Sequence, residues 1–271
     1  MPNRVKFLAV QIVCTGLIHP NGLQADQVNV RYREGRAHGF LVLRTLEGKT
    51  LAVGDATQNT AGDRVTTKLV LRFKDGSMHE ETTEFSQRDK FQLMTYRVVQ
   101  KGPAFKRPLE TSIDFSKGQI TVRYTDDHGK EKVLSERLEL PPDVANGIIP
   151  TILKNFPPAA SQLTVSMEAT TPKPRLVKLT IIPQGEEPFS AGGYNRNATH
   201  YVVKVEIGGA AGVVAPLVGK QPPDVHIWIL GGEAPAFLKS EGPLYEGGPI
   251  WRIEQVSPVW PRTPTANSPK N

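Results

Sequence analysis

Cysteine is almost absent from this sequence of 271 residues, in which Cys14 is the single one. Cys14 lies in a segment with the pattern of a secretory signal, so cleavage after Ala25 would leave a mature chain without thiols. Such a chain has no disulfide, no catalytic thiolate and no metal site built on cysteine. Two enzyme motifs are also missing, the His-Glu-x-x-His of zinc proteases and the Gly-x-Ser-x-Gly of α/β-hydrolases.

Long charged runs are missing as well, since no five consecutive residues carry the same charge. Removing residues 1–25 takes away Arg4 and Lys6 and no acidic residue, which lowers the formal net charge of +6 by two. The remaining positive charge is spread along the chain and does not form the basic patch that nucleic acids require. We therefore expect no nucleic-acid partner.

The longest apolar run is Phe7–Ile18, and Arg4 and Lys6 precede it. It is shorter than the roughly 20 residues that a membrane-spanning helix needs. We predict a signal peptide over residues 1–25 and no transmembrane segment in the mature chain. The protein would then be secreted, and most simply periplasmic in a Gram-negative-type envelope. A lipoprotein anchored through Cys14 is not favoured, because Val13 stands where a small residue is expected. The alternative is that the N-terminal run is a buried strand or helix.

Alternating apolar and polar residues recur along the rest of the chain, with many glycines (24) and prolines (23) between them. In Gln119–Thr125, for example, Ile120, Val122 and Tyr124 fall on one face of a strand. Lys74-Asp75-Gly76-Ser77 is a hairpin signal. The pattern predicts an all-β, mainly antiparallel fold, a strongly curved sheet or half-barrel over residues 26–260 as a single domain. The Pro-, Ser- and Thr-rich residues 261–271 are expected to be a disordered tail.

One segment, residues 140–156, has helical periodicity instead. Its apolar stripe, four residues apart at each step, consists of Val144, Ile148, Ile152 and Phe156. Asp143 is a suitable N-cap, whereas Gly147 and Pro150 disfavour a regular helix near the middle. We predict one central kinked helix that packs on the concave face of the sheet.

The C-terminal run His226–Glu254, with its Trp228 strand and its Gly248-Pro249 before the last strand, resembles an uncharacterised bacterial family of secreted β-proteins. The strand Tyr201–Gly208 resembles the one that precedes that run in the family. The family is similar in turn to the periplasmic lipoprotein-carrier half-barrel. This resemblance implies a hydrophobic groove for an acyl chain or for the lipid of a partner. It implies no catalytic residue.

The leading hypothesis is a non-enzymatic secreted protein that binds a lipid, another apolar ligand or a lipidated partner in the groove of the sheet. We expect no cofactor and no metal. Apolar and aromatic side chains would supply the groove, as in most ligand pockets. The candidates are Ile148, Ile152 and Phe156, which would gate the groove, together with Tyr124, Trp228 and Trp251.

Two alternatives stay open. The first is a structural or envelope-assembly protein whose core is filled. The second is a hydrolase that uses His200 or His226, which fall on two expected strands without an identifiable nucleophile. His79 lacks a second histidine at helical spacing, and Gly208–Gly212 has the pattern of a turn and not of a phosphate loop.

Overall fold

The computed structural model describes residues 27–126, 128–170, 173–191, 194–206 and 222–256. Within them the chain forms fourteen antiparallel strands of one sheet, which confirms the all-β prediction. The strands are β1 (Ala37–Arg44), β2 (Thr50–Ala61), β3 (Arg64–Phe73), β4 (Met78–Gln87), β5 (Phe91–Lys101), β6 (Leu109–Asp114), β7 (Gln119–Thr125), β8 (Glu131–Arg137), β9 (Leu163–Thr170), β10 (Pro174–Ala191), β11 (Tyr194–Glu206), β12 (Val225–Leu230), β13 (Ala236–Gly242) and β14 (Trp251–Val256).

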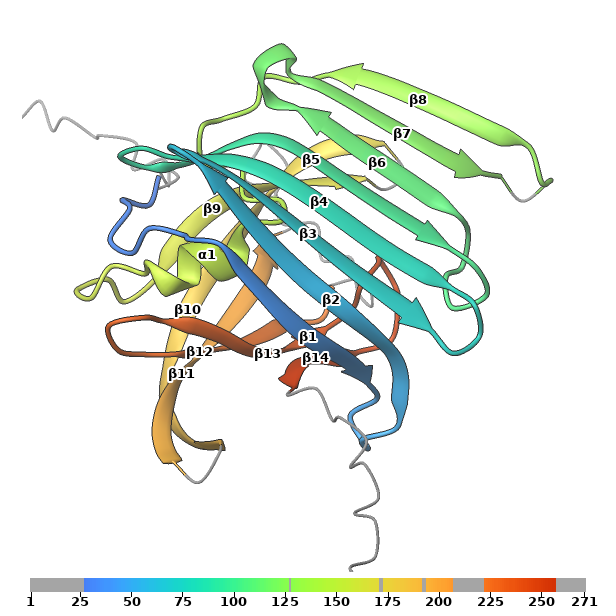
Figure 1. Cartoon of the computed structure of the whole chain (residues 1–271). Helices are drawn as coiled ribbons and strands as arrows, with labels where there is room; N and C mark the ends of the chain where they lie inside the picture. The colour runs from blue at the N-terminus through green and yellow to red at the C-terminus, as the bar shows by residue number, and fades with distance from the viewer. Residues whose placement is uncertain (1–26, 127, 171–172, 192–193, 207–221, 257–271) are drawn as a thin grey trace, which may run out of the picture.

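The order of the strands is β8-β7-β6-β5-β4-β3-β2-β1-β14-β13-β12-β11-β10-β9. Each strand pairs with its sequence neighbour except that β1 pairs with β14, which joins the two ends of the folded chain. The sheet is not closed, because β8 and β9 lie at its two ends and do not pair with each other. It is a curved sheet, as predicted, and it winds back on itself so that β9–β12 lie opposite β3–β5 (Figure 1).

The space between these two walls holds the main hydrophobic core and helix α1 (Ile149–Lys154) (Figure 1). The main core combines Val65 and Phe85 from one wall with Ile181 and Ile227 from the other. The helix and the loop before it contribute side chains between them. We call two smaller clusters the second core, around Leu43, Phe73, Phe105 and Trp251, and the third core, around Leu93, Ile113, Ile120 and Val122. Each Å² of apolar surface buried in these three clusters contributes roughly 25 cal/mol to the stability of the folded sheet.

The helix is shorter than the sequence predicted. It covers only residues 149–154, and Pro150 stands in its first turn, where a proline is tolerated. Gly147 has a φ of +71°, outside any helix, and a Cβ there would lie 2.0 Å from the Thr83 hydroxyl oxygen. Asp143 is not an N-cap, because its carboxylate instead accepts a hydrogen bond from the Ser166 hydroxyl (2.8 Å) on β9. The predicted kinked helix is therefore a loop followed by a short straight helix.

Hairpins connect most neighbouring strands, and the predicted one at residues 74–77 joins β3 to β4. Gly76 has a φ of +86°, and the Asp75 carboxylate accepts a hydrogen bond from the Ser77 amide (2.9 Å). Residues 190–197 are polar and glycine-rich, yet β10 and β11 stay in register up to the pair Ala191 and Tyr194. The predicted signal peptide and the predicted tail lie outside the described residues.

Candidate functional site

A cleft of about 410 Å³ lies between the second and third cores. Its walls come from the ends of β5, β7 and β9, the start of β6, and two loops, the one between β5 and β6 and the one between β13 and β14. The size falls within the range of roughly 300–1,000 Å³ that is usual for small-molecule sites. The lining residues are Gln100, Phe105, Lys106, Arg107, Leu109, Val122, Tyr124, Thr170, Tyr245, Glu246 and Gly247.

Aromatic and aliphatic side chains form most of this surface. The Phe105 and Tyr245 rings meet edge to face with their centroids 5.6 Å apart, and the Tyr245 hydroxyl donates to the Ala104 carbonyl (3.3 Å). Leu109 and Tyr124 lie opposite each other on β6 and β7. These contacts fix an apolar wall before any ligand arrives, which lowers the entropic cost of binding.

Two cations, Lys106 and Arg107, and one carboxylate, Glu246, complete the lining. The Arg107 guanidinium lies 6.0 Å from the centroid of the Tyr124 ring, at the outer limit of a cation–π contact. The charged groups leave one net positive charge beside an apolar wall. The arrangement suits a ligand with an apolar body and one anionic group.

A neutral histidine supports the cleft from behind. Gln100, which lines the cleft, is hydrogen-bonded to the His79 Nδ1 (3.1 Å) and donates to the Leu244 carbonyl (2.8 Å). Burial lowers the pKa of His79 to about 4, so its ring carries no charge at neutral pH. His79 therefore orients Gln100 and does not contact the cleft in the way a metal ligand or a base would.

Two acids with raised pKa values are connected to the cleft, Glu168 through the cleft-lining Thr170 and Glu81 through Tyr96. Thr170 lines the cleft and donates to Glu168 Oε1 (2.5 Å), and burial raises the pKa of Glu168 to about 7. The Tyr96 hydroxyl donates to Glu81 (3.2 Å), whose pKa burial also raises. Glu168 is close enough that its charge contributes to raising the pKa of Tyr96. Glu168 is thus a buried acid bonded to a residue of the cleft wall, whereas Glu81 and Tyr96 are partly buried and do not line the cleft.

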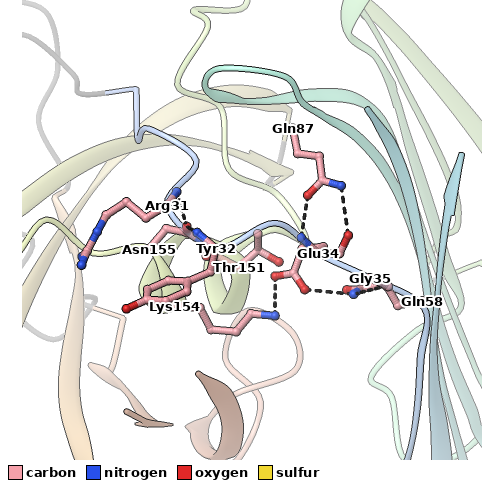
Figure 2. A network of polar contacts seen from close by, with 9 residues as sticks. All are labelled: Arg31, Tyr32, Glu34, Gly35, Gln58, Gln87, Thr151, Lys154 and Asn155. Atoms are coloured by element: carbon pink, nitrogen blue, oxygen red, sulfur yellow. Dashed lines mark hydrogen bonds and ion pairs between the residues drawn. The ribbon is translucent and has the colours of Figure 1, made fainter. Parts of the chain in front are cut away.

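A separate polar network holds helix α1 in place and is structural. Figure 2 shows the Glu34 carboxylate between Lys154 and Gln58, while Gln87 bonds both the amide and the carbonyl of Glu34 (2.6 and 3.0 Å). Asn155 accepts from the amides of residues 31 and 32 (2.8 and 2.7 Å). The segment before β1 is thereby tied to the helix and to β2 and β4.

The predicted groove residues occupy four different environments. Ile148, Ile152 and Phe156 are all buried in the main core, between the two walls of the sheet. Their expected contact with a ligand stays a prediction. Tyr124 lines the cleft, and Trp251 belongs to the second core beside the Phe73 ring (5.6 Å between centroids).

Trp228, the sixth candidate, lies on the opposite face of β12 from the core residues Ile227 and Ile229. Its ring stacks on His200 with the centroids 4.4 Å apart, and its indole N–H donates to Glu187 (2.8 Å). The Lys239 ammonium lies 3.9 Å from the centroid of the ring. Trp228 is only 7% exposed because these polar neighbours cover it.

The two histidines of the hydrolase hypothesis belong to the same cluster. His200 Nε2 lies 2.9 Å from His226 Nδ1, and His200 Nδ1 lies 3.1 Å from a Glu187 oxygen. Partial burial lowers the pKa of His200 against the opposing effect of Glu187. Within the described residues, no serine or threonine hydroxyl is hydrogen-bonded to either ring. The cluster has the acid and the base of a catalytic arrangement and lacks a nucleophile beside them.

Sequence reasoning missed most of the cleft. Phe105, Lys106 and Arg107 lie in the loop between β5 and β6, which Gly102-Pro103 and Arg107-Pro108 bracket. An aromatic residue followed by two cations between two prolines was the available signal. Tyr245 and Thr170 are distant from this loop in the sequence, and the curvature of the sheet brings them to the same cleft.

No group of three or more His, Cys, Asp or Glu side chains in the described ranges is placed to hold a metal ion. In the same ranges, no helix has both the length and the apolar character needed to cross a bilayer.

Comparisons with known proteins give little beyond this description. No protein-family model matches the chain, and no curated protein does. Among solved structures, the chain is similar to a β-barrel-like protein of the domain of unknown function DUF1849 from Brucella abortus. The two are 11% identical, the TM-score is 0.46, and the match covers 83% of this chain and 97% of the other. The strand order itself defines the chain as an all-β protein with one open, curved sheet in the described residues.

Proposed function

We propose that this protein binds an amphipathic ligand, an acyl chain with an anionic head such as a fatty acid, in the cleft between the second and third cores. The observation that carries the proposal is the apolar wall of Phe105, Leu109 and Tyr124 beside Lys106 and Arg107. Each methylene buried on this wall would contribute about 0.8 kcal/mol. The two cations would select for the anionic head, with Glu246 reducing the net charge to one.

The proposal keeps the hypothesis of lipid binding that the sequence suggested. It places the ligand in the cleft and not beside Ile148, Ile152 and Phe156. Ile148, Ile152 and Phe156 pack in the main core, whereas the cleft is formed by strand ends and two loops between the second and third cores. Export through residues 1–25 and a role resembling the lipoprotein carriers, with a lipid or a lipidated partner as cargo, are parts of the same proposal. An envelope location would give such a carrier its substrates.

The test is uptake of a fluorescent fatty acid by the purified chain, with native mass spectrometry of any lipid that co-purifies. Leu109→Trp should fill the cleft and abolish uptake, whereas Leu176→Trp, at an exposed position on β10, should not change it. Replacing Lys106 and Arg107 by Glu should weaken binding of a fatty acid roughly tenfold or more and spare the matching fatty alcohol. No uptake and a clean apo mass would refute the proposal and favour the filled-core, structural alternative.

A second candidate is the hydrolase suggested by His200. The observation in its favour is the Glu187–His200–His226 arrangement, in which an acid orients one ring and a second ring faces it. Hydrolysis of activated esters that disappears in His200→Ala, with unchanged stability, would support it. Equal rates for the variant and the wild type would remove it.

A further inference from the structure

The free edge of the sheet at β8 has an unusual sequence. Among the strands of the described ranges, β8 pairs only with β7, so one side of its backbone has no strand neighbour there. Figure 1 shows β8 at the outer end of the sheet, beyond β7. Sheet edges of this kind tend to pair with another strand unless something blocks them.

The backbone groups on that side are set by the pairing with β7. The Asp126 amide donates to the Lys130 carbonyl and the Leu138 amide donates to the Gly118 carbonyl, so the even-numbered residues point toward β7. The N–H and C=O groups of the odd residues 131, 133, 135 and 137 therefore point outward, because the direction alternates along a strand. Val133, in the middle, is a large apolar side chain that is 53% exposed.

Two copies of β8, Glu-Lys-Val-Leu-Ser-Glu-Arg, can be aligned antiparallel with Leu134 of one copy opposite Leu134 of the other. In this alignment the two copies are complementary in charge. Glu131 falls opposite Arg137 of the second copy, and Lys132 falls opposite Glu136, each pair twice. The outward-pointing residues then face each other, as an antiparallel ladder requires. A shift by one residue in either direction instead places Glu131 opposite Glu136 or Lys132 opposite Arg137.

We propose that β8 pairs with β8 of a second copy of this chain, in the antiparallel register centred on Leu134, to form a two-fold symmetric dimer. Within the described residues, Glu131, Glu136 and Arg137 make no ion pair in the single chain, so their charges are available for the partner. Lys132 lies 3.6 Å from the Asp126 carboxylate and is about half exposed, so it would share its charge between Asp126 and Glu136 of the second copy. Leu134 would meet its own copy on the inner face, where it already packs against the third core. The sheets of the two copies would then continue across the axis.

This contact is small, so the dimer should be weak and concentration-dependent. Contacts of this size bind weakly, so sedimentation equilibrium of the full chain should be measured up to about 500 µM. It should show a monomer–dimer equilibrium, and raised salt should shift that equilibrium toward the monomer. Glu131→Arg and Arg137→Glu, each alone, place like charges opposite each other twice. Each should weaken dimerisation roughly tenfold or more.

The double variant E131R/R137E restores opposite charges at both positions and should recover the dimer. Val133→Pro gives an independent test, because it removes an outward N–H and leaves the bonds to β7 in place. Circular dichroism and thermal denaturation would show that each variant is folded. A wild type that stays monomeric, a dimer indifferent to the single reversals, or a double variant as weak as the single ones would overturn the proposal.

Discussion

The ion pair between Glu34 and Lys154 gives a direct measure of what holds helix α1 between the two walls of the sheet. The side chains are 8% and 16% exposed, and the carboxylate has one further side-chain donor, Gln58 Nε2 at 2.9 Å. Lys154→Met would leave the Glu34 charge buried with a single neutral partner. Removing one member of a buried pair typically costs about 3–5 kcal/mol, because the remaining charge keeps its desolvation penalty.

The matching change Glu34→Gln should cost less, about 1–3 kcal/mol, because the long Lys154 side chain can extend toward water. In the double variant no charge is left uncompensated. Its loss of stability should therefore be smaller than the sum of the single losses by about 2 kcal/mol or more.

Equilibrium urea unfolding at pH 7 measures all three variants. Lys74→Met, at an exposed position in the β3–β4 turn, controls for the loss of a lysine and should stay within about 0.5 kcal/mol of the wild type. A cost below about 1 kcal/mol for Lys154→Met, or strictly additive losses, would show that the pair does not anchor the helix, contrary to the coupling expected of a buried pair.

The other predictions concern three inner residues and the N-terminus. The pKa of Glu168 rises from 4.5 unfolded to about 7 folded, so stability should fall as pH rises through this window, and Glu168→Gln should gain up to about 3 kcal/mol at pH 8 in urea unfolding. A stability of the wild type that does not change over this window would refute it. The pKa of His79 is lowered from 6.5 to about 4, so its contribution is complete above pH 6.5 and is lost toward pH 4; an NMR titration midpoint near 6.5 would contradict this. Gly147→Ala should cost about 1–3 kcal/mol in thermal denaturation, partly relieved by Thr83→Ala, since the new Cβ meets the Thr83 hydroxyl and the φ is positive. N-terminal sequencing of the exported protein should begin after Ala25, and an intact Met1 would refute the signal peptide.

Local sequence patterns predicted the strands and the turns because few residues determine them. Ile120, Val122 and Tyr124 alternate in the sequence and lie on the inner face of β7, where the first two are buried in the third core. The hairpin at Asp75-Gly76 forms as predicted, since a carboxylate acceptor and a positive φ are needed within four residues. Such features depend little on the rest of the chain.

The helix shows the limit of periodicity. All four stripe residues from Val144 to Phe156 are buried, as the pattern predicted. A spacing of four residues nevertheless reports burial and not backbone conformation. Gly147 and Pro150 determine where the helix begins. Gly147 has a positive φ, which no α-helix has, and Pro150 lies in the first turn of the helix, where a proline is tolerated. Both were visible in the sequence as disfavouring a regular helix.

The placement of Trp228 could have been inferred from strand register. Alternation puts His200 on the face opposite Tyr201 and Val203, and His200 pairs with Trp228 across β11 and β12. Directly paired residues share a face, so Trp228 had to lie with His200 and away from Ile227. The size and apolar character of Trp228 suggested that it lines a groove. In the structure the side chains of Glu187, His200 and Lys239 cover its ring instead.

The cleft could not be predicted, because its walls meet only through the curvature of the whole sheet. Gln100 on β5 bonds the Leu244 carbonyl across 144 residues of sequence, and Phe105 meets Tyr245 in the same contact zone. Residues of the second and third cores line the cleft together with the charged side chains of Lys106, Arg107 and Glu246. A ligand that fills this gap would bury the facing surfaces of both cores, so its binding should stabilise the folded chain in proportion to its occupancy.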